Sequence, residues 1–226
     1  MTAPPLVLFD LDDTLCDYSG ARTGRLRTAY GDAFAAAGIR DVDLDAVIAE
    51  SLEIHPHGSH HFPALLARHG MSDAELAQQA QRWYLGNRFR GLALFSDAQS
   101  VLAQVRALPG VRGVGLITNG PADVQRDKID LLGLGPEVDF AVISGEVGVE
   151  KPDPAIFHEA LRRGNVDSAN AIYIGDSPEF DMEGARAAEI RRIWMNRAGI
   201  PWPLNTPAPE LETRTLSNIP EILTSL

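Results

Sequence analysis

The sequence predicts an α/β protein with a doubly wound, Rossmann-like parallel sheet and an inserted all-helical cap domain. Short apolar runs typical of buried strands recur along the chain, at residues 6–9, 114–118, 140–144, 171–175 and 193–195. Segments with helical character lie between these runs, and strands that alternate with helices imply a parallel sheet covered on both faces. A long stretch after the first run contains no further strand-like run, which predicts an insertion into the sheet-forming part of the chain.

The core elements follow in order. The first strand is expected at Leu6–Phe9, where Leu, Val and Phe precede polar residues as they do in a strand buried on both faces. Four core helices are expected at about residues 96–107, 121–132, 154–163 and 178–188. Four proline residues between 199 and 209 predict an extended loop before a short final segment.

The insertion is expected to span residues 16–90, which leaves residues 1–15 and 91–226 as the α/β core domain. Its helices are predicted at residues 24–37, 43–53, 62–69 and 73–88, where Ala, Leu, Gln, Glu and Arg recur at helical spacing. Ser72 precedes Glu75 by three residues, which predicts a capping box with Ser72 at the helix N-terminus. Because the insertion leaves the core after the first strand, it is expected to act as a lid over the strand ends.

Composition excludes several function classes. The chain has 226 residues, 45% of them hydrophobic, and a formal net charge of −11. This charge argues against binding to a nucleic acid polymer or to an anionic membrane, since both are bound through clustered Lys and Arg. The single cysteine, Cys16, has no partner for an internal disulfide, and the N-terminus lacks the pattern of a signal peptide. A cytoplasmic location is the default expectation.

Polar residues directly after the apolar runs are the candidate site. Ligands of doubly wound sheets bind outside the carboxyl ends of the strands, so these residues are expected to converge. They are Asp10, Asp12, Thr118, Asn119, Asp176 and Asp181. Two carboxylates two residues apart repel each other, so Asp10 and Asp12 imply a bound metal ion or chemistry in which one is protonated and the other is not.

Four short motifs in this order resemble those of the haloacid dehalogenase superfamily, and specifically of its phosphatases with a helical cap inserted after the first motif. They are Asp10-Leu11-Asp12-Asp13-Thr14, Thr118-Asn119-Gly120, Lys151-Pro152, and Gly175-Asp176-Ser177 followed by Asp181. Each motif alone is a weak signal, but all four stand in order at predicted strand ends or loops. The segment from Thr118 to Lys128 further resembles the nucleotidase and N-acylneuraminate phosphatase branch.

The resemblance implies a hydrolase of small phosphate monoesters, such as nucleotides or sugar phosphates. Asp10 is then the nucleophile that forms an aspartyl-phosphate, and Asp12 is the general acid and base. Lys151 is expected to balance the charge of Asp10 and of the phosphoryl oxygens. The Thr118 hydroxyl and the backbone amides of Asn119 and Gly120 complete the phosphate-binding set, together with Lys151.

The cofactor implied by the resemblance is Mg²⁺. Its expected ligands are Asp10, the backbone carbonyl of Asp12 and Asp176, with Asp181 as a further acidic partner, because magnesium prefers a few oxygen ligands together with water and substrate phosphate. The expected partner is a small phosphorylated metabolite, and the sequence does not predict an oligomeric state.

Alternatives stay open for the single motifs. The first could form a calcium loop, although Ala21 stands where such a loop needs Glu. Lys151 could be an ordinary solvated lysine, Asp176 and Asp181 could cap a helix, and the Thr118 motif could be a simple turn. In the insertion, His57 and His61 have the spacing of a zinc pair within the group His55, His57, His60 and His61, but the glutamate of a metalloprotease motif is absent and a solvated or packed cluster is the preferred interpretation.

Alternatives also stay open for the whole chain. Dehalogenases of the superfamily lack an acid two residues after the nucleophile, so Asp12 argues against that chemistry. A phosphomutase would keep every core motif and would differ in its lid. A non-catalytic binding or scaffold protein would be expected to have lost one of the motif residues, and all of them are present.

Overall fold

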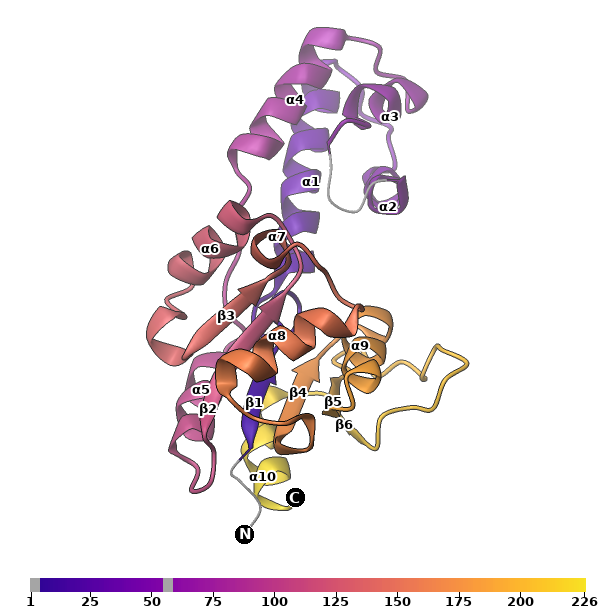
Figure 1. Cartoon of the computed structure of the whole chain (residues 1–226). Coiled ribbons are helices and arrows are strands. Elements are labelled where there is room, and N and C mark those ends of the chain that lie inside the picture. Colours follow the sequence, from indigo (N-terminus) through magenta and orange to yellow (C-terminus); the bar gives the residue numbers. More distant parts are fainter. Residues whose placement is uncertain (1–4, 55–58) are drawn as a thin grey trace. The chain divides into compact units, whose positions relative to one another are not determined.

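The computed structural model describes residues 5–54 and 59–226. Packing divides the chain into two compact units, one of Met1–Asp17 with Ala93–Leu226 and the other of Tyr18–Leu92. Both bounds fall two residues after those predicted from the sequence, where the inserted domain starts at residue 16 and the core resumes at residue 91. Figure 1 labels the strands and helices of both units.

A six-stranded parallel sheet forms the centre of the α/β unit, which confirms the predicted fold class. Its strands are β1 (Leu6–Phe9), β2 (Gly113–Thr118), β3 (Phe140–Ile143), β4 (Ala171–Gly175), β5 (Arg191–Met195) and β6 (Leu211–Thr213). They lie in the order β3-β2-β1-β4-β5-β6. Phe9 of β1 stands opposite Leu116 of β2 and Ile174 of β4. The chain that follows β1 therefore starts from the middle of the carboxyl edge of the sheet.

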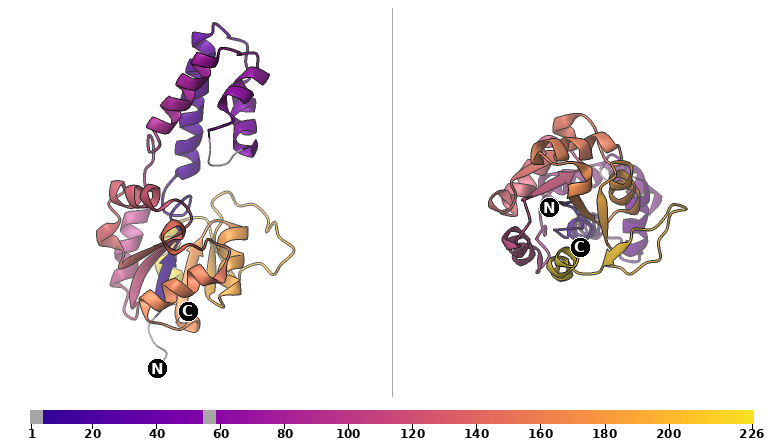
Figure 2. Two further views of the ribbon diagram at one scale, coloured as in Figure 1. Left: turned by 45° about the horizontal axis from the view of Figure 1, so that its top comes forward. Right: turned by 60° about the horizontal axis from the view of Figure 1, so that its bottom comes forward.

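Helices cover both faces of this sheet. They are α5 (Ala98–Ala107), α6 (Ala122–Leu131), α7 (Ser144–Val147), α8 (Pro154–Gly164), α9 (Glu183–Ala187) and α10 (Ile219–Thr224). Helix α8 packs on β2 and β3 and α9 packs on β5, while α5 packs on β2 and on α10. Figures 1 and 2 show α8 and α9 over one face of the sheet and α5 with α10 on the other. Leu6 and Leu8 belong to the core cluster under α8 and α9, and the residues that alternate with them face the opposite layer.

An aromatic pair lies at the centre of the core under α8. Phe157 and Tyr173 are both fully buried, and their rings meet edge to face with centroids 5.0 Å apart. Tyr173 belongs to β4, the strand next to β1. The core packing therefore fixes a side chain whose hydroxyl group points toward the carboxyl edge of the sheet.

The structure differs from the predicted elements where segments are short. Strand β6 and helices α7 and α10 were not predicted, because three to six residues carry too little periodic signal. The helix expected at residues 178–188 is a π-helical turn, Pro178–Met182, followed by α9.

Four helices form the second unit: α1 (Tyr18–Ala36), α2 (Leu44–Ile54), α3 (Phe62–Arg68) and α4 (Ala74–Gly86). Helix α1 packs along α4 and against α2, and α3 packs on α4. Figure 1 labels these four helices. Tyr30 of α1 lies in its core with no exposed surface, and its ring centroid is 4.5 Å from that of Phe62. The helical unit thus has a hydrophobic core of its own.

The predicted capping box at the start of α4 is wrong. The residue at the N-cap position is Asp73, and its side chain accepts hydrogen bonds from the backbone N–H groups of Glu75 and Leu76. Glu75 therefore stands at the second helical position, one short of the position from which a capping-box glutamate reaches back. An aspartate caps a helix as well as a serine does, so the pattern permitted both starts.

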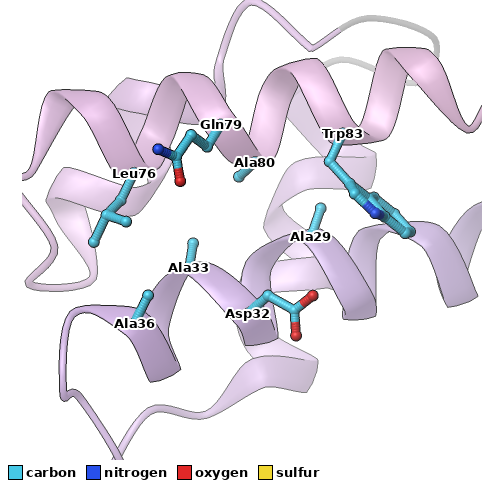
Figure 3. Close-up of a pocket in the computed structure, with 8 residues that line it drawn as sticks. All are labelled: Ala29, Asp32, Ala33, Ala36, Leu76, Gln79, Ala80 and Trp83. Carbon is cyan, nitrogen blue, oxygen red and sulfur yellow. The ribbon is translucent and has the colours of Figure 1, made fainter.

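Figure 3 shows a pocket of about 260 Å³ between α1 and α4 of the helical unit. Its lining is mostly small and apolar, with Asp32 and Gln79 as its polar members. The lining residues are Ala29, Asp32, Ala33, Ala36, Leu76, Gln79, Ala80 and Trp83. None of these residues belongs to the candidate site predicted from the sequence.

Two expectations drawn from composition concern the whole chain. The thiol of Cys16 is free and buried. Across residues 5–54 and 59–226, no helix combines the length and the apolar character that a membrane span requires.

We expect Phe157→Ala to lower the free energy of unfolding by about 3–5 kcal/mol, because it opens a cavity under Tyr173 in the centre of the core. Urea denaturation measures the change. His158→Ala is the matched control on the same helix, since this side chain is exposed and its loss should cost less than about 0.5 kcal/mol. A loss below about 1 kcal/mol for Phe157→Ala would show that the pair does not organise the core.

Candidate active site

Carboxylates and a lysine gather at the carboxyl edge of the sheet. Asp10 follows the last residue of β1, and Asp176 follows the last residue of β4, its neighbour in the sheet. Thr118 is the last residue of β2, the other neighbour of β1. The parallel topology therefore brings Asp10 together with residues that stand more than a hundred positions later in the sequence.

Lys151 bridges two of the carboxylates. Its Nζ atom lies 2.6 Å from Oδ1 of Asp10 and 2.7 Å from Oδ1 of Asp181. All three residues are almost fully buried, with at most 4% of their surface exposed. The Tyr173 hydroxyl donates to Asp181 Oδ1 at 2.7 Å and accepts from Lys151 Nζ at 3.1 Å. Lys151 is therefore not a solvated surface lysine.

Electrostatics explain why this lysine stays charged. Burial alone would lower the pKa of Lys151, but the charges of Asp10 and Asp181 outweigh burial and hold this pKa above its ordinary value. Burial, followed by the charge of Asp181, raises the pKa of Tyr173 as well. The Tyr173 hydroxyl therefore keeps its proton and acts as a hydrogen-bond donor.

Three carboxylates form a cluster suited to a cation. Oxygens of Asp10, Asp176 and Asp181 all lie within 4.8 Å of one another. The Thr14 hydroxyl donates to Asp176 Oδ1 at 3.2 Å. Gly175 permits the close approach of Asp181, because a Cβ atom at this position would lie 2.5 Å from Asp181 Cγ. The carboxylates of Asp10 and Asp181 contact the ammonium group of Lys151, and Asp176 adds a third carboxyl group to the cluster.

The pKa values of the cluster reflect this excess of negative charge. Burial, only partly opposed by Lys151, raises the pKa of Asp10 to about 7. Burial and the charges of Asp181 and Asp10 raise the pKa of Asp176 to about 9. A divalent cation would favour the ionised form of both groups, and carboxylate oxygens are the donors that hard cations such as Mg²⁺ prefer. The residues present therefore fit the predicted metal.

The side chain of Asp12 has different partners. Lys128 Nζ lies 2.8 Å from its Oδ1 atom and 2.7 Å from its Oδ2 atom, and Gln125 Nε2 donates to Oδ2 at 3.2 Å. Both partners belong to α6. The two carboxylates of the first motif thus have separate surroundings, Asp10 with Lys151 and Asp12 with Lys128. The prediction that Asp12 contacts the metal concerns its backbone carbonyl and stays a prediction.

The second motif is held by a network of its own. The Thr118 hydroxyl accepts a short hydrogen bond from Gln125 Nε2. The Asn119 side chain accepts from the backbone N–H of Lys151 at 2.8 Å and donates to its carbonyl oxygen at 3.0 Å. The backbone N–H of Gly120 donates to the Ser144 hydroxyl at 2.9 Å. Asn119 therefore fixes the backbone that carries Lys151, and the phosphate contacts predicted for this motif stay predictions.

Sequence reasoning missed Gln125, Lys128 and Tyr173. A signal was present for the first two, since these polar residues stand three positions apart on one face of the helix that follows the second motif. Tyr173 stands within an apolar run. The sequence there predicts a buried ring and does not indicate that the hydroxyl group has a role in the site.

The histidine cluster in the insertion is only partly described. His55 and His57 lie outside the described residues. His61 is buried in the helical unit, where its Nε2 atom lies 2.6 Å from the Ser51 hydroxyl and 3.2 Å from the Tyr30 hydroxyl. The predicted pairing of His57 with His61 at a zinc ion stays a prediction.

Comparison with known proteins gives a family match over most of the chain. A family model for haloacid dehalogenase-like hydrolases matches residues 4–189. Phosphoserine phosphatase of Thermus thermophilus is 40% identical over 110 residues, which are 48% of this chain and 43% of that protein. Glyceraldehyde 3-phosphate phosphatase of Methanopyrus kandleri is 34% identical over 84% of this chain and 83% of its own. Human N-acylneuraminate-9-phosphatase is 26% identical over 97% of this chain and 94% of its own.

One similar solved structure is named for a different activity, dehalogenation. The crystal structure of a 2-haloacid dehalogenase from Pseudomonas syringae is 34% identical, with a TM-score of 0.64. The match covers 98% of this chain and 99% of that chain.

We expect the metal-free protein to lose stability as the pH rises from about 5 to about 9. The folded-state pKa values of Asp10 and Asp176 lie above the unfolded value of about 3.9, so the folded state binds more protons in this range and is destabilised as they leave. Asp176→Asn should flatten this dependence and raise the free energy of unfolding at pH 9 by at least about 1.4 kcal/mol, the equivalent of one pKa unit.

Urea denaturation in chelator at several pH values measures this effect. Asp127→Asn, which removes an exposed carboxylate from α6, is the control. Equal pH slopes for wild type and Asp176→Asn would contradict the excess of negative charge.

Proposed function

Because the chain belongs to the haloacid dehalogenase-like hydrolase family, we propose that it hydrolyses small phosphate monoesters through an aspartyl-phosphate intermediate with Mg²⁺ as cofactor. Phosphatases acting on small phosphorylated substrates are prominent among its relatives. The observation that carries the proposal is the pair Asp10 and Asp12, whose side chains have different cationic partners and can therefore take different roles.

Asp10 is the nucleophile in this proposal. Its Oδ2 atom is the oxygen not bound to Lys151, and an attack on phosphorus breaks the bond to the leaving oxygen and leaves an aspartyl-phosphate. The ammonium group of Lys151 balances the negative charge of Asp10 and Asp181, and it lies where charge grows on the phosphoryl oxygens. Buried neighbours hold Lys151 on all sides, so its position needs no rearrangement during the reaction.

Asp12 is the general acid and base. In the first half-reaction its proton goes to the leaving oxygen, and in the second its carboxylate takes a proton from the attacking water. Thr118 contributes a hydroxyl group to the phosphoryl oxygens. Because Gln125 donates to Thr118 Oγ1, the Thr118 hydroxyl hydrogen is available for a different acceptor.

Asp10, Asp176 and Asp181 would hold Mg²⁺, with the backbone carbonyl of Asp12 as a further ligand. When bound, the ion neutralises charge on Asp10 and on the phosphoryl oxygens and thereby favours the ionised nucleophile. The excess of negative charge in the three-carboxylate cluster supports a divalent cation at this place.

The substrate class is a small phosphorylated metabolite, with sugar phosphates and nucleoside monophosphates as first candidates. Two relatives are named as a glyceraldehyde 3-phosphate phosphatase and an N-acylneuraminate-9-phosphatase. A strongly acidic chain with local positive charge at Lys128 and Lys151 fits a small anion better than a polymer.

Removal of halide from a 2-haloacid is the second candidate, because of the similarity to a protein of that name. A halide ion leaves without a proton, so this reaction would not need Asp12 as a general acid. Absence of both phosphate and chloride release in the assays below would favour a phosphomutase or a scaffold protein.

Asp10→Asn should lower phosphate release by about 10³-fold or more, because the amide is not a nucleophile toward phosphorus. The assay measures phosphate release from a panel of sugar phosphates and nucleoside monophosphates with Mg²⁺, and chloride release from 2-chloropropionate in parallel. Asp127→Asn is the control for the loss of a carboxylate, and circular dichroism verifies the fold. Substantial turnover by folded Asp10→Asn would contradict the nucleophile, and chloride release without phosphate release would favour the dehalogenase.

Chelation should stop turnover, and Mg²⁺ but not Ca²⁺ should restore it. The reason is that Ca²⁺ takes six to eight oxygen ligands at longer distances, whereas three carboxylates and a phosphoryl oxygen suit the smaller octahedral ion. The measurement is the rate of phosphate release after dialysis against EDTA and titration with each metal. Full activity in EDTA would show that the cluster acts without a metal.

A further inference from the structure

The chain contains two lysines, and both lie at the candidate active site. Of its 20 Lys and Arg residues, Lys128 and Lys151 are the lysines and the others are arginines. The side chains of the two lysines are 5% and 4% exposed. A lysine ammonium group is a compact point charge, whereas a guanidinium group is a planar fork that needs more room. Both lysines thus place a buried, compact charge at the candidate active site.

Each lysine is paired with one carboxylate of the first motif. Lys151 binds Asp10, and the role proposed for it follows from that contact. Lys128 has no role in the mechanism proposed above, yet its Nζ atom lies within 2.8 Å of both side-chain oxygens of Asp12. A contact to both oxygens fixes the rotation of the carboxylate as well as its place.

Gln125 supports the same carboxylate from one turn earlier on α6. Its Nε2 atom donates to Asp12 Oδ2 at 3.2 Å and to the Asn119 carbonyl oxygen at 3.0 Å. Both of these oxygens only accept hydrogen bonds, so the NH₂ end of the amide must face them. The Thr118 hydroxyl lies within hydrogen-bond distance of the same Nε2 atom, so two amide hydrogens are shared among three acceptors, and Gln125 ties the carboxylate to the end of β2.

We propose, on the basis of the proposed function, that Lys128 is the positioning residue that holds the ionised Asp12 carboxylate for the second half-reaction. In the first half-reaction, Asp10 forms a bond to phosphorus and the bond to the leaving oxygen breaks with its electron pair. In the second, the water oxygen forms a bond to phosphorus, the bond from phosphorus to Asp10 breaks, and the water proton goes to Asp12. Only the second step requires Asp12 as a carboxylate, which is the form that pairs with the ammonium group of Lys128.

A substrate whose leaving group needs no proton distinguishes the two half-reactions, because only the second then depends on Asp12 and Lys128. The p-nitrophenolate ion is such a leaving group, so formation of the aspartyl-phosphate from p-nitrophenyl phosphate should not depend on Asp12 or on Lys128. Hydrolysis of that intermediate should depend on both. If Lys128 instead bound the phosphoryl group directly, its removal would slow the first step as well.

The test is stopped-flow release of p-nitrophenolate by Lys128→Met and wild type with saturating Mg²⁺. We expect Lys128→Met to give a burst of about one equivalent per active site at the wild-type rate, followed by a steady state that is slower by about 10²-fold. Quenched samples should contain phosphorylated protein, which Asp10→Asn should lack. Arg126→Met is the matched control, because Arg126 is an exposed cation on the same helix that pairs with Glu146.

A second measurement does not depend on how well Lys128→Met folds. Wild type labelled with ¹³C at lysine Cε should give two side-chain signals, and Lys128→Gln assigns one of them by its loss. Asp12→Asn removes the carboxylate charge, so it should shift the Lys128 signal more than the Lys151 signal.

The outcomes are distinct. The proposal is supported by a burst in Lys128→Met that Arg126→Met lacks, together with a larger shift of the Lys128 signal than of the Lys151 signal in Asp12→Asn. Wild-type kinetics in Lys128→Met, an equal loss in both steps, or an unmoved Lys128 signal in Asp12→Asn would overturn it and leave the phosphatase in place. Absence of Mg²⁺-dependent phosphate release by wild type would overturn the proposed function and the role of Lys128 together.

Discussion

The candidate site depends on the excess of negative charge at the carboxyl end of β1. Asp10 and Asp181 bind the ammonium group of Lys151, and Asp176 lies beside them, so the cluster holds three carboxyl groups and one cation. The surrounding structure serves this arrangement: a glycine gives Asp181 room to approach, a buried tyrosine donates to it, and Asn119 fixes the backbone of Lys151. A cluster of this kind is costly as a structural device and useful as a cation site.

The sequence was informative wherever a short pattern determines a position. Buried strands are apolar runs, and the residue that follows such a run must lie at the sheet edge, so the amino-acid order alone placed Asp10, Thr118 and Asp176. The direction in which a side chain points was not predictable in the same way. Lys128 and Asp12 are 116 positions apart, and their ion pair follows from how α6 packs after β2, which no local pattern encodes.

The misplaced cap of α4 has a similar origin. Ser72 and Asp73 are both good capping residues, and it is Asp73 that accepts the backbone hydrogen bonds of the first turn. The local rule allows two starts that differ by one residue. The helical unit has its own core around Tyr30, with buried hydrogen bonds to Ser51 and His61, so its surface can vary without disturbing the sheet.

The near absence of lysine has a practical consequence for the chemistry of this protein in solution. Reagents that acylate or cross-link lysine amines find no lysine on the outer surface, because both lysines are buried against carboxylates. Acetylation or ubiquitin transfer to a lysine side chain would likewise have to enter the candidate active site. Incorporation of an amine-directed probe at Lys128 and Lys151, located by peptide mapping, therefore reports on how often their ion pairs come apart.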